Sequence, residues 1–213
     1  MWYKATMPRS SIPIAVVLAI LALAPAASAE WFGDAYLGPA LTTGSRLSFT
    51  TFGEEQKQNL SGRSSAEFGL RFGRWLDEVP WLAIAADVSY FRPAPDVQTV
   101  PLSLLVMARY GFLKDEEFTR GRLQPYVGVG PSLFINNVSG SIGFQESNDT
   151  STDIGLDVRL GTAFLIETNW SAFIEYRFTH VSPTWDVKVF GGSVPASTTF
   201  DTHHVIFGMG YRF

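Results

Sequence analysis

Hydrophobic and polar residues alternate along most of the chain beyond residue 30. In the closing segment Asp201 to Phe213, one set of alternate positions holds Val, Phe, Met, Tyr and Phe, while the other holds His, Gly, Gly and Arg. Side chains of a β-strand point to opposite faces with a period of two, so this segment predicts a strand with one apolar face. We expect eight such strands, approximately Trp31–Thr42, Gly62–Gly73, Trp81–Arg92, Thr99–Phe112, Leu123–Ile135, Asp153–Ile166, Trp170–Ser182 and Asp201–Phe213.

The connections between these strands alternate in length. Thr43–Ser61, Asn136–Thr152 and Pro183–Phe200 are long and rich in Ser, Thr, Asn and Gly, whereas Glu167–Asn169 is a tight turn. Short turns on one side and long loops on the other are typical of a membrane barrel whose strands run up and down. The pattern therefore predicts an all-β fold, an eight-stranded antiparallel transmembrane up-and-down β-barrel.

Charged residues of the predicted strands share one face. They are Asp34, Glu67, Arg71, Asp87, Arg109, Asp157, Arg159, Glu175, Arg177 and Arg212. A soluble lipocalin-like barrel would show the same alternation with its faces exchanged, but a water-facing surface normally carries lysine, and no predicted strand contains one. Arginine suits buried ion pairs, and eight strands leave an interior only wide enough for side chains. We expect a closed lumen filled by an interior charge network.

The first 29 residues have the features of an export signal. Lys4 and Arg9 precede an apolar run from Ile12 to Ala24, and Ala27-Ser28-Ala29 supplies the small residues of a cleavage site. We expect cleavage before Glu30, which leaves residues 30–213 as one barrel domain. Its formal charge changes from −4 to −6, which argues against a nucleic-acid partner, and the chain has no cysteine for disulfides or thiolate metal sites.

Large aromatic residues stand at the ends of strands next to the shorter turns. Trp31, Trp75, Trp81, Trp170 and Phe213 occupy such positions. Belts of aromatic residues mark the interface between a membrane and water, so we expect these five to be interface aromatics. The alternative is that tryptophans near turns cap the core of a soluble protein.

Four segments carry a family resemblance that covers the chain beyond the export signal. They are W-F-G-D-A-Y-L-G-P-A from Trp31, L-Q-P-Y-V-G-V-G-P-S-L-F from Leu123, I-E-Y-R-F from Ile174 and the final G-M-G-Y-R-F. Together they resemble the small OmpA/OmpX-type outer-membrane β-barrels. The resemblance implies the outer membrane of a Gram-negative bacterium, contact with outer-membrane lipids and lipopolysaccharide, and insertion by the barrel-insertion machinery, which recognises the terminal Phe213.

The same barrel frame hosts several functions, so the resemblance is weak for activity. We expect a structural or surface-interaction role, in which the extracellular loops meet a ligand or a host surface. The alternative from the charge network is a narrow ion channel. We expect no cofactor and no metal.

One local resemblance suggests an enzyme. The segment F-T-H-V-S-P resembles the H-x-S element of outer-membrane lipid A deacylases, which implies Ser182 as nucleophile and His180 as base. The family continues this element with Asn-Ala, but Pro183 follows here, and the position of its catalytic Glu holds Val194. The acid role would fall to Asp201, so this lipid A deacylase reading is an alternative only.

The register between the last two strands decides what meets at this rim. If Trp170 lies opposite Phe213, then His180 faces His203, and the serine two residues further along faces Asp201. A metal site of His180, Asp201 and His203 is a further alternative, although it lacks a fourth ligand.

Overall fold

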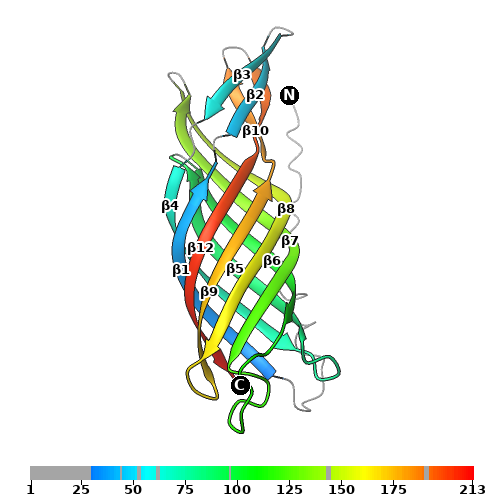
Figure 1. Cartoon of the computed structure of the whole chain (residues 1–213). Helices are drawn as coiled ribbons and strands as arrows, with labels where there is room; N and C mark the ends of the chain where they lie inside the picture. The colour runs from blue at the N-terminus through cyan, green and yellow to red at the C-terminus, as the bar shows by residue number, and fades with distance from the viewer. Residues whose placement is uncertain are drawn as a thin grey trace, which may run out of the picture.

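Twelve β-strands and no helix make up the fold in the computed structural model, which describes residues 30–43, 45–51, 54–60, 63–95, 97–142, 145–189 and 192–213. Eight strands form a closed antiparallel barrel in the order β1-β12-β9-β8-β7-β6-β5-β4, and β1 pairs with β4 to close it (Figure 1). The predicted eight-stranded barrel is confirmed. No helix within the described ranges is long and apolar enough to cross a membrane. The expected export signal lies outside them.

The barrel strands agree closely with the predicted segments, except that two of them continue much further. They are β1 (Glu30–Thr42), β4 (Arg63–Trp75), β5 (Leu82–Ala94), β6 (Val97–Arg109), β7 (Leu123–Ile142), β8 (Gln145–Leu165), β9 (Trp170–Val181) and β12 (Phe200–Arg212). The prediction of a loop over 136–152 is wrong, because β7 and β8 pair continuously from Leu123↔Phe164 to Ile142↔Gln145. The sequence of this segment has few apolar residues to mark one face of a strand, so its polar composition resembles that of a loop.

A second sheet continues the barrel at the end opposite the tight turns. It consists of β2 (Ser45–Thr51), β3 (Glu54–Leu60), β10 (Thr184–Val189) and β11 (Gly192–Ser197), in the order β10-β11-β2-β3. These strands fall in two segments that the sequence predicts as loops. We call this end, with the tall β7–β8 hairpin, the extension end, and the opposite end the turn end (Figure 1).

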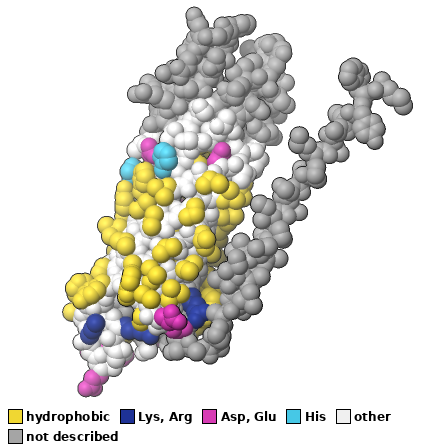
Figure 2. Space-filling model, turned by 90° about the vertical axis from the view of Figure 1, so that its right-hand side faces the viewer, with side chains coloured by type: hydrophobic (Ala, Val, Ile, Leu, Met, Phe, Trp, Pro, Cys, Tyr) yellow, Lys and Arg dark blue, Asp and Glu magenta, His cyan; other side chains and the backbone are white. Residues whose placement is uncertain are grey.

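The outer wall of the barrel is apolar. Hydrophobic side chains cover the wall in a band, and charged or histidine side chains stand at its two edges (Figure 2). Leu37, Leu70 and Ile154 are each more than 60 % exposed, which is unusual unless lipid covers them. Burial alternates strictly along β6 and β9, as expected when one face of a strand is outside and the other fills the lumen.

Aromatic side chains gather at the turn end of this band. Trp31 stacks on Phe72 with ring centroids 5.2 Å apart, Trp170 meets Tyr211 at 5.0 Å, and Trp81 is exposed. Phe213 lies beyond the last strand, is exposed and contacts the Tyr211 ring. Four of the five expected interface aromatics therefore lie on the outer side.

Trp75 is the exception, because it points into the barrel. Its side chain is buried, its ring lies 5.7 Å from that of Phe32, and the guanidinium of Arg109 lies 3.9 Å from its ring centroid. Trp75 shares its strand parity with the inward-facing Glu67 and Arg71, so alternation determines its side and nearness to a turn does not. The prediction that it is an interface aromatic is corrected accordingly.

Candidate functional site

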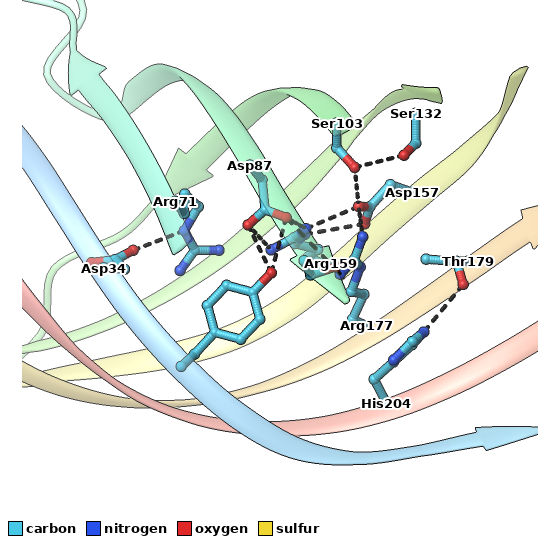
Figure 3. Close-up of polar contacts among 12 residues, drawn as sticks. Asp34, Arg71, Asp87, Ser103, Ser132, Asp157, Arg159, Arg177, Thr179 and His204 are labelled. Carbon is cyan, nitrogen blue, oxygen red and sulfur yellow. Dashed lines mark hydrogen bonds and ion pairs between the residues drawn. The ribbon is translucent and has the colours of Figure 1, made fainter. Parts of the chain in front are cut away.

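Arginine side chains cross-link the lumen near mid-height. The Arg159 guanidinium pairs with Asp87 at 2.8 Å and with Asp157 at 2.9 Å (Figure 3). It also pairs with Glu175 at 3.3 Å. These four side chains are fully buried. A buried charge is tolerated only when partners replace its lost water, and the planar fork of arginine can meet several carboxylates at once.

Arg177 extends the same network toward the opposite wall. It pairs with Asp157 at 2.7 Å and with Glu67 at 2.5 Å. Glu67 in turn lies 2.6 Å from Nδ1 of His204, and Nε2 of His204 lies 3.1 Å from the Thr179 hydroxyl. His204 is fully buried, so it is part of the lumen core.

Arg71 completes the network on the other side. It donates to Asp34 at 2.8 Å and to Glu175 at 2.6 Å, and the Tyr126 hydroxyl donates to Glu175 at 2.7 Å. With Ser103, which donates to Asp157 at 2.6 Å, every barrel strand contributes a side chain. The network therefore ties all eight strands to one another through the lumen.

A second, separate cluster lies at the turn end of the lumen. Glu30 receives hydrogen bonds from Arg109 at 2.7 and 2.9 Å, pairs with Arg212 at 3.0 Å and also binds Arg120. The ten predicted lumen charges thus divide: the five acids meet three arginines and His204 at mid-height, whereas Arg109 and Arg212 meet Glu30.

Glu30 and His204 join the lumen clusters although the predicted charge network does not include them. The first predicted strand begins at Trp31, one residue after Glu30, although the parity of Glu30 matches that of Asp34. His204 shares a strand face with Arg212, but the predicted network counts only Asp, Glu and Arg. Parity alone would have placed both side chains in the lumen.

Apolar layers lie on both sides of the charged layer. At the extension end the layer consists of Ala40, Phe91, Val97, Phe134, Val181 and Phe200. At the turn end, Phe32, Trp75 and Phe173 belong to a second apolar cluster. Together with charged side chains, among them Arg71 and Arg109, they line a cavity of about 30 Å³, which holds no more than a few water molecules. Within the described residues, the paired charges thus lie between two layers that contain aromatic rings.

Glycines let aromatic rings lie flat against the inner wall. A Cβ built on Gly69 would lie 2.4 Å from the Tyr36 ring, and one on Gly161 would lie 2.5 Å from the Tyr126 ring. The Tyr36 hydroxyl thereby reaches the Asp87 carboxylate at 2.9 and 3.0 Å. The glycines therefore serve close packing inside the barrel.

The outer rim of β9 and β12 has a different register from the one predicted. His180 pairs with Asp201 and Trp170 with Tyr211, because Phe213 lies past the end of β12 and hydrogen-bonds to Trp31 on β1. The prediction that His180 faces His203 is therefore wrong by two residues. Trp170 lies opposite Tyr211, two residues before the position that the sequence suggested.

This register brings a histidine and an acid together. Nδ1 of His180 lies 2.6 Å from the Asp201 carboxylate, and both side chains are nearly half exposed. Ser182 instead hydrogen-bonds to Thr199 at 3.1 Å. The base and orienting acid of the proposed triad are thus adjacent, while the serine hydroxyl is engaged with another partner.

His203 does not join the other two residues of the predicted metal alternative. Its Nδ1 lies 2.6 Å from the Tyr176 hydroxyl, and its ring packs 5.3 Å from that of Phe178. Within the described ranges, no group of three or more His, Cys, Asp or Glu side chains is arranged to hold a metal ion.

Known proteins support the same architecture. The family described as outer membrane protein beta-barrel domain matches residues 14–213. The fold is similar to Neisserial surface protein A (18 % identity, TM-score 0.54, covering 88 % of this chain and 100 % of that one). It is also similar to AlkL in lipid bilayers (14 % identity, TM-score 0.59, covering 99 % of this chain and 97 % of that one). A third similar structure is OprG from Pseudomonas aeruginosa (14 % identity, TM-score 0.51, covering 87 % of this chain and 96 % of that one). No curated protein matches the sequence.

Proposed function

Because this chain belongs to the outer membrane protein beta-barrel family, we propose that it is a closed barrel with a structural and surface-interaction role. In this role the extension end is extracellular and contacts another surface or a ligand, while the barrel anchors it in the outer membrane of a Gram-negative bacterium. The signal segment is removed before Glu30. Outer-membrane lipids and lipopolysaccharide surround the wall.

The filled lumen is the observation that carries this proposal. Arg159 and Arg177 are fully buried in contact with acids from the opposite wall, and ring layers lie above and below them. Such a lumen favours rigidity over transport, because opening a path would separate several buried ion pairs at once. Binding is then left to the exposed extension end, where loops and edge strands offer adaptable contacts.

Shortening the extension while keeping the barrel tests this role. One variant replaces 46–59 with a short turn, and a second replaces 185–196; the control shortens the turn-end connection 114–119. We expect the first two to reduce adhesion or weaken resistance of the envelope to detergents, with normal insertion and unchanged lipid A. If both behave like the control and like the wild type, the extension has no such role.

A second candidate, lipid A deacylation, is favoured by the contact between His180 and Asp201. A histidine held by a carboxylate is the base unit of a hydrolase, and it stands at the level where lipid A ester groups occur. Catalysis would require Ser182 to leave Thr199 and turn to His180. Mass spectrometry of lipid A incubated with the purified protein tests this: loss of an acyl chain that depends on Ser182, with Ser64→Ala as control, would establish the enzyme.

A further inference from the structure

A hollow of about 920 Å³ interrupts the outer wall of the barrel across β12, β1, β4, β5 and β6. Strand pairing places two rows of outward side chains beside it. The row nearer the turn end is Met209, Ala35, Leu70 and Val88, and the other row is Phe207, Leu37, Phe68 and Tyr90. Between the rows lie Gly208, Tyr36, Gly69 and Ser89. The two glycines have no side chain, and those of Tyr36 and Ser89 are buried inside the barrel, so the floor is backbone.

The small side chain of Ala35 explains why the wall is hollow at this place. It contributes one methyl group, whereas its neighbours in the row, Met209 and Leu70, are long and exposed. The resulting depression has a bare backbone floor and apolar sides, the chemistry that suits an acyl chain. An acyl chain in the hollow would make van der Waals contacts with the backbone floor and the side chains around it, which are lost while the hollow is empty.

Arg92 stands directly beyond the hollow on the same face of β5. It lies two residues past Tyr90, its Nε donates to the Tyr90 hydroxyl at 2.8 Å, and its guanidinium lies 6.0 Å from the Tyr90 ring. Tyr90 also packs on Phe68 with ring centroids 5.3 Å apart. These contacts hold the exposed cation at the mouth of the hollow.

The height of Arg92 matches the edge of the membrane. Ten residues separate it from Leu82 at the turn end of β5, which is about 33 Å along a strand and about 25 Å of height at a tilt of about 40°. That height equals the thickness of the apolar band of an outer-membrane barrel. Arg92 is therefore at the level of outer-leaflet headgroups.

The guanidinium of Arg92 has capacity left for an external anion. Within the described part of the chain it forms no ion pair with a carboxylate, and Nε is the atom that Tyr90 occupies. Its amino groups remain able to make the paired hydrogen bonds that arginine forms with phosphate. Arg92 can thus bind the phosphate of a phosphorylated lipid, and the hollow can bind one of its acyl chains.

We propose that this wall binds one molecule of lipid A, with an acyl chain in the hollow above Gly69 and Gly208 and a phosphate on Arg92. The proposal rests on the outer-membrane location proposed above and adds a defined lipid site to it. Filling the hollow at Ala35, or removing the charge at Arg92, weakens the site without touching the lumen.

The test uses the purified barrel in detergent micelles and native mass spectrometry with added hexa-acylated, bis-phosphorylated lipid A. We expect a one-to-one adduct, weakened at least tenfold by Ala35→Trp and about tenfold by Arg92→Gln, because a hydrogen bond to a charged group contributes about 1.5–3 kcal/mol. Ala108→Trp, the same change elsewhere on the outer wall, binds like the wild type. With dephosphorylated lipid A, Arg92→Gln and the wild type bind equally.

Equal binding by all four proteins would overturn the proposal, since it would indicate non-specific annular lipid only. Heat-modifiable migration on gels checks that each variant is folded, and Val88→Trp replaces Ala35→Trp if the latter fails to fold. Because this assay uses no cells, a negative result leaves the adhesion and envelope test of the proposed function unaffected, and the reverse also holds.

Discussion

Arg159 and Asp87 lie on strands separated in the barrel wall by β6 and β7, yet their side chains meet at 2.8 Å across the lumen. This contact joins residues 72 positions apart in sequence, and it is fully buried. Ion pairs of this kind link strands on opposite sides of the barrel through the lumen. They allow an eight-stranded barrel to be rigid without an apolar core throughout.

Removing the central arginine should destabilise the barrel strongly. Arg159→Met leaves Asp87, Asp157 and Glu175 with too little positive charge, and breaking a buried pair in this way costs about 3–5 kcal/mol. The free energy of unfolding, measured in urea with phospholipid vesicles, checks this value.

The matched control is Arg74→Met. Arg74 pairs with Asp77 at 2.8 Å near the turn end, where both side chains are partly exposed, so its loss should cost less than about 1 kcal/mol. Equal losses in the two variants would show that the lumen network contributes no more than a surface pair.

A methyl group at Gly69 should also destabilise the fold. The added Cβ of Gly69→Ala would lie 2.4 Å from the Tyr36 ring and displace it from Asp87, and overpacking of this kind costs about 1–3 kcal/mol. At Gly33 the nearest atom would lie 3.7 Å away, so Gly33→Ala should have little effect in the same unfolding experiment. A smaller loss at Gly69 than at Gly33 would contradict the packing described.

The two tryptophans beside the turn-end connection between β4 and β5 should respond differently to truncation. Trp75→Ala removes a buried ring between Phe32 and Arg109 and should cost about 3–5 kcal/mol. Trp81→Ala removes an exposed ring at the membrane interface and should cost less. The denaturant concentration at the midpoint of unfolding is compared for the two variants. A larger loss for Trp81→Ala than for Trp75→Ala would contradict the inward position of Trp75.

Cysteine pairs test the register of the rim directly, because the chain has no cysteine of its own. Residues directly opposite in an antiparallel pair are close enough for a disulfide. His180→Cys with Asp201→Cys should form an intramolecular disulfide upon mild oxidation, whereas His180→Cys with His203→Cys should form little. Mass spectrometry after alkylation of free thiols measures the fraction of disulfide in each variant. A larger fraction in the variant with cysteines at 180 and 203 would support the register predicted from the sequence instead.

The barrel strands could be predicted because lipid and lumen impose opposite polarity on alternate residues. Asp157 and Arg159, for example, are separated by one apolar residue that faces outward. In Ser45–Thr51 and Gly192–Ser197 the alternation is short: each has only two apolar residues on one face, within a segment that is otherwise rich in Ser, Thr and Gly. Within the described ranges they form two local hairpins, β2 with β3 and β10 with β11, which two residue pairs between β11 and β2 join. So short an alternation does not distinguish such a hairpin from a loop.

The lumen site could be predicted in composition but not in partners. Parity places Arg159, Asp87 and Glu67 inside, yet it does not say which strands face each other across the barrel. That follows from closure and shear, which depend on all eight strands together. Trp75 and the rim register were mispredicted because the first was assigned by its nearness to a turn and the second by assuming that Phe213 is the last paired residue.

Conductance of the purified barrel in planar lipid bilayers tests the closed lumen most directly. The ion-pair network and the apolar layers on either side of it predict no discrete conductance steps for the wild type, and none for Arg74→Gln. Stepwise currents in the wild type that change when Arg109 or Arg177 is neutralised would contradict the closed lumen and establish a narrow ion channel.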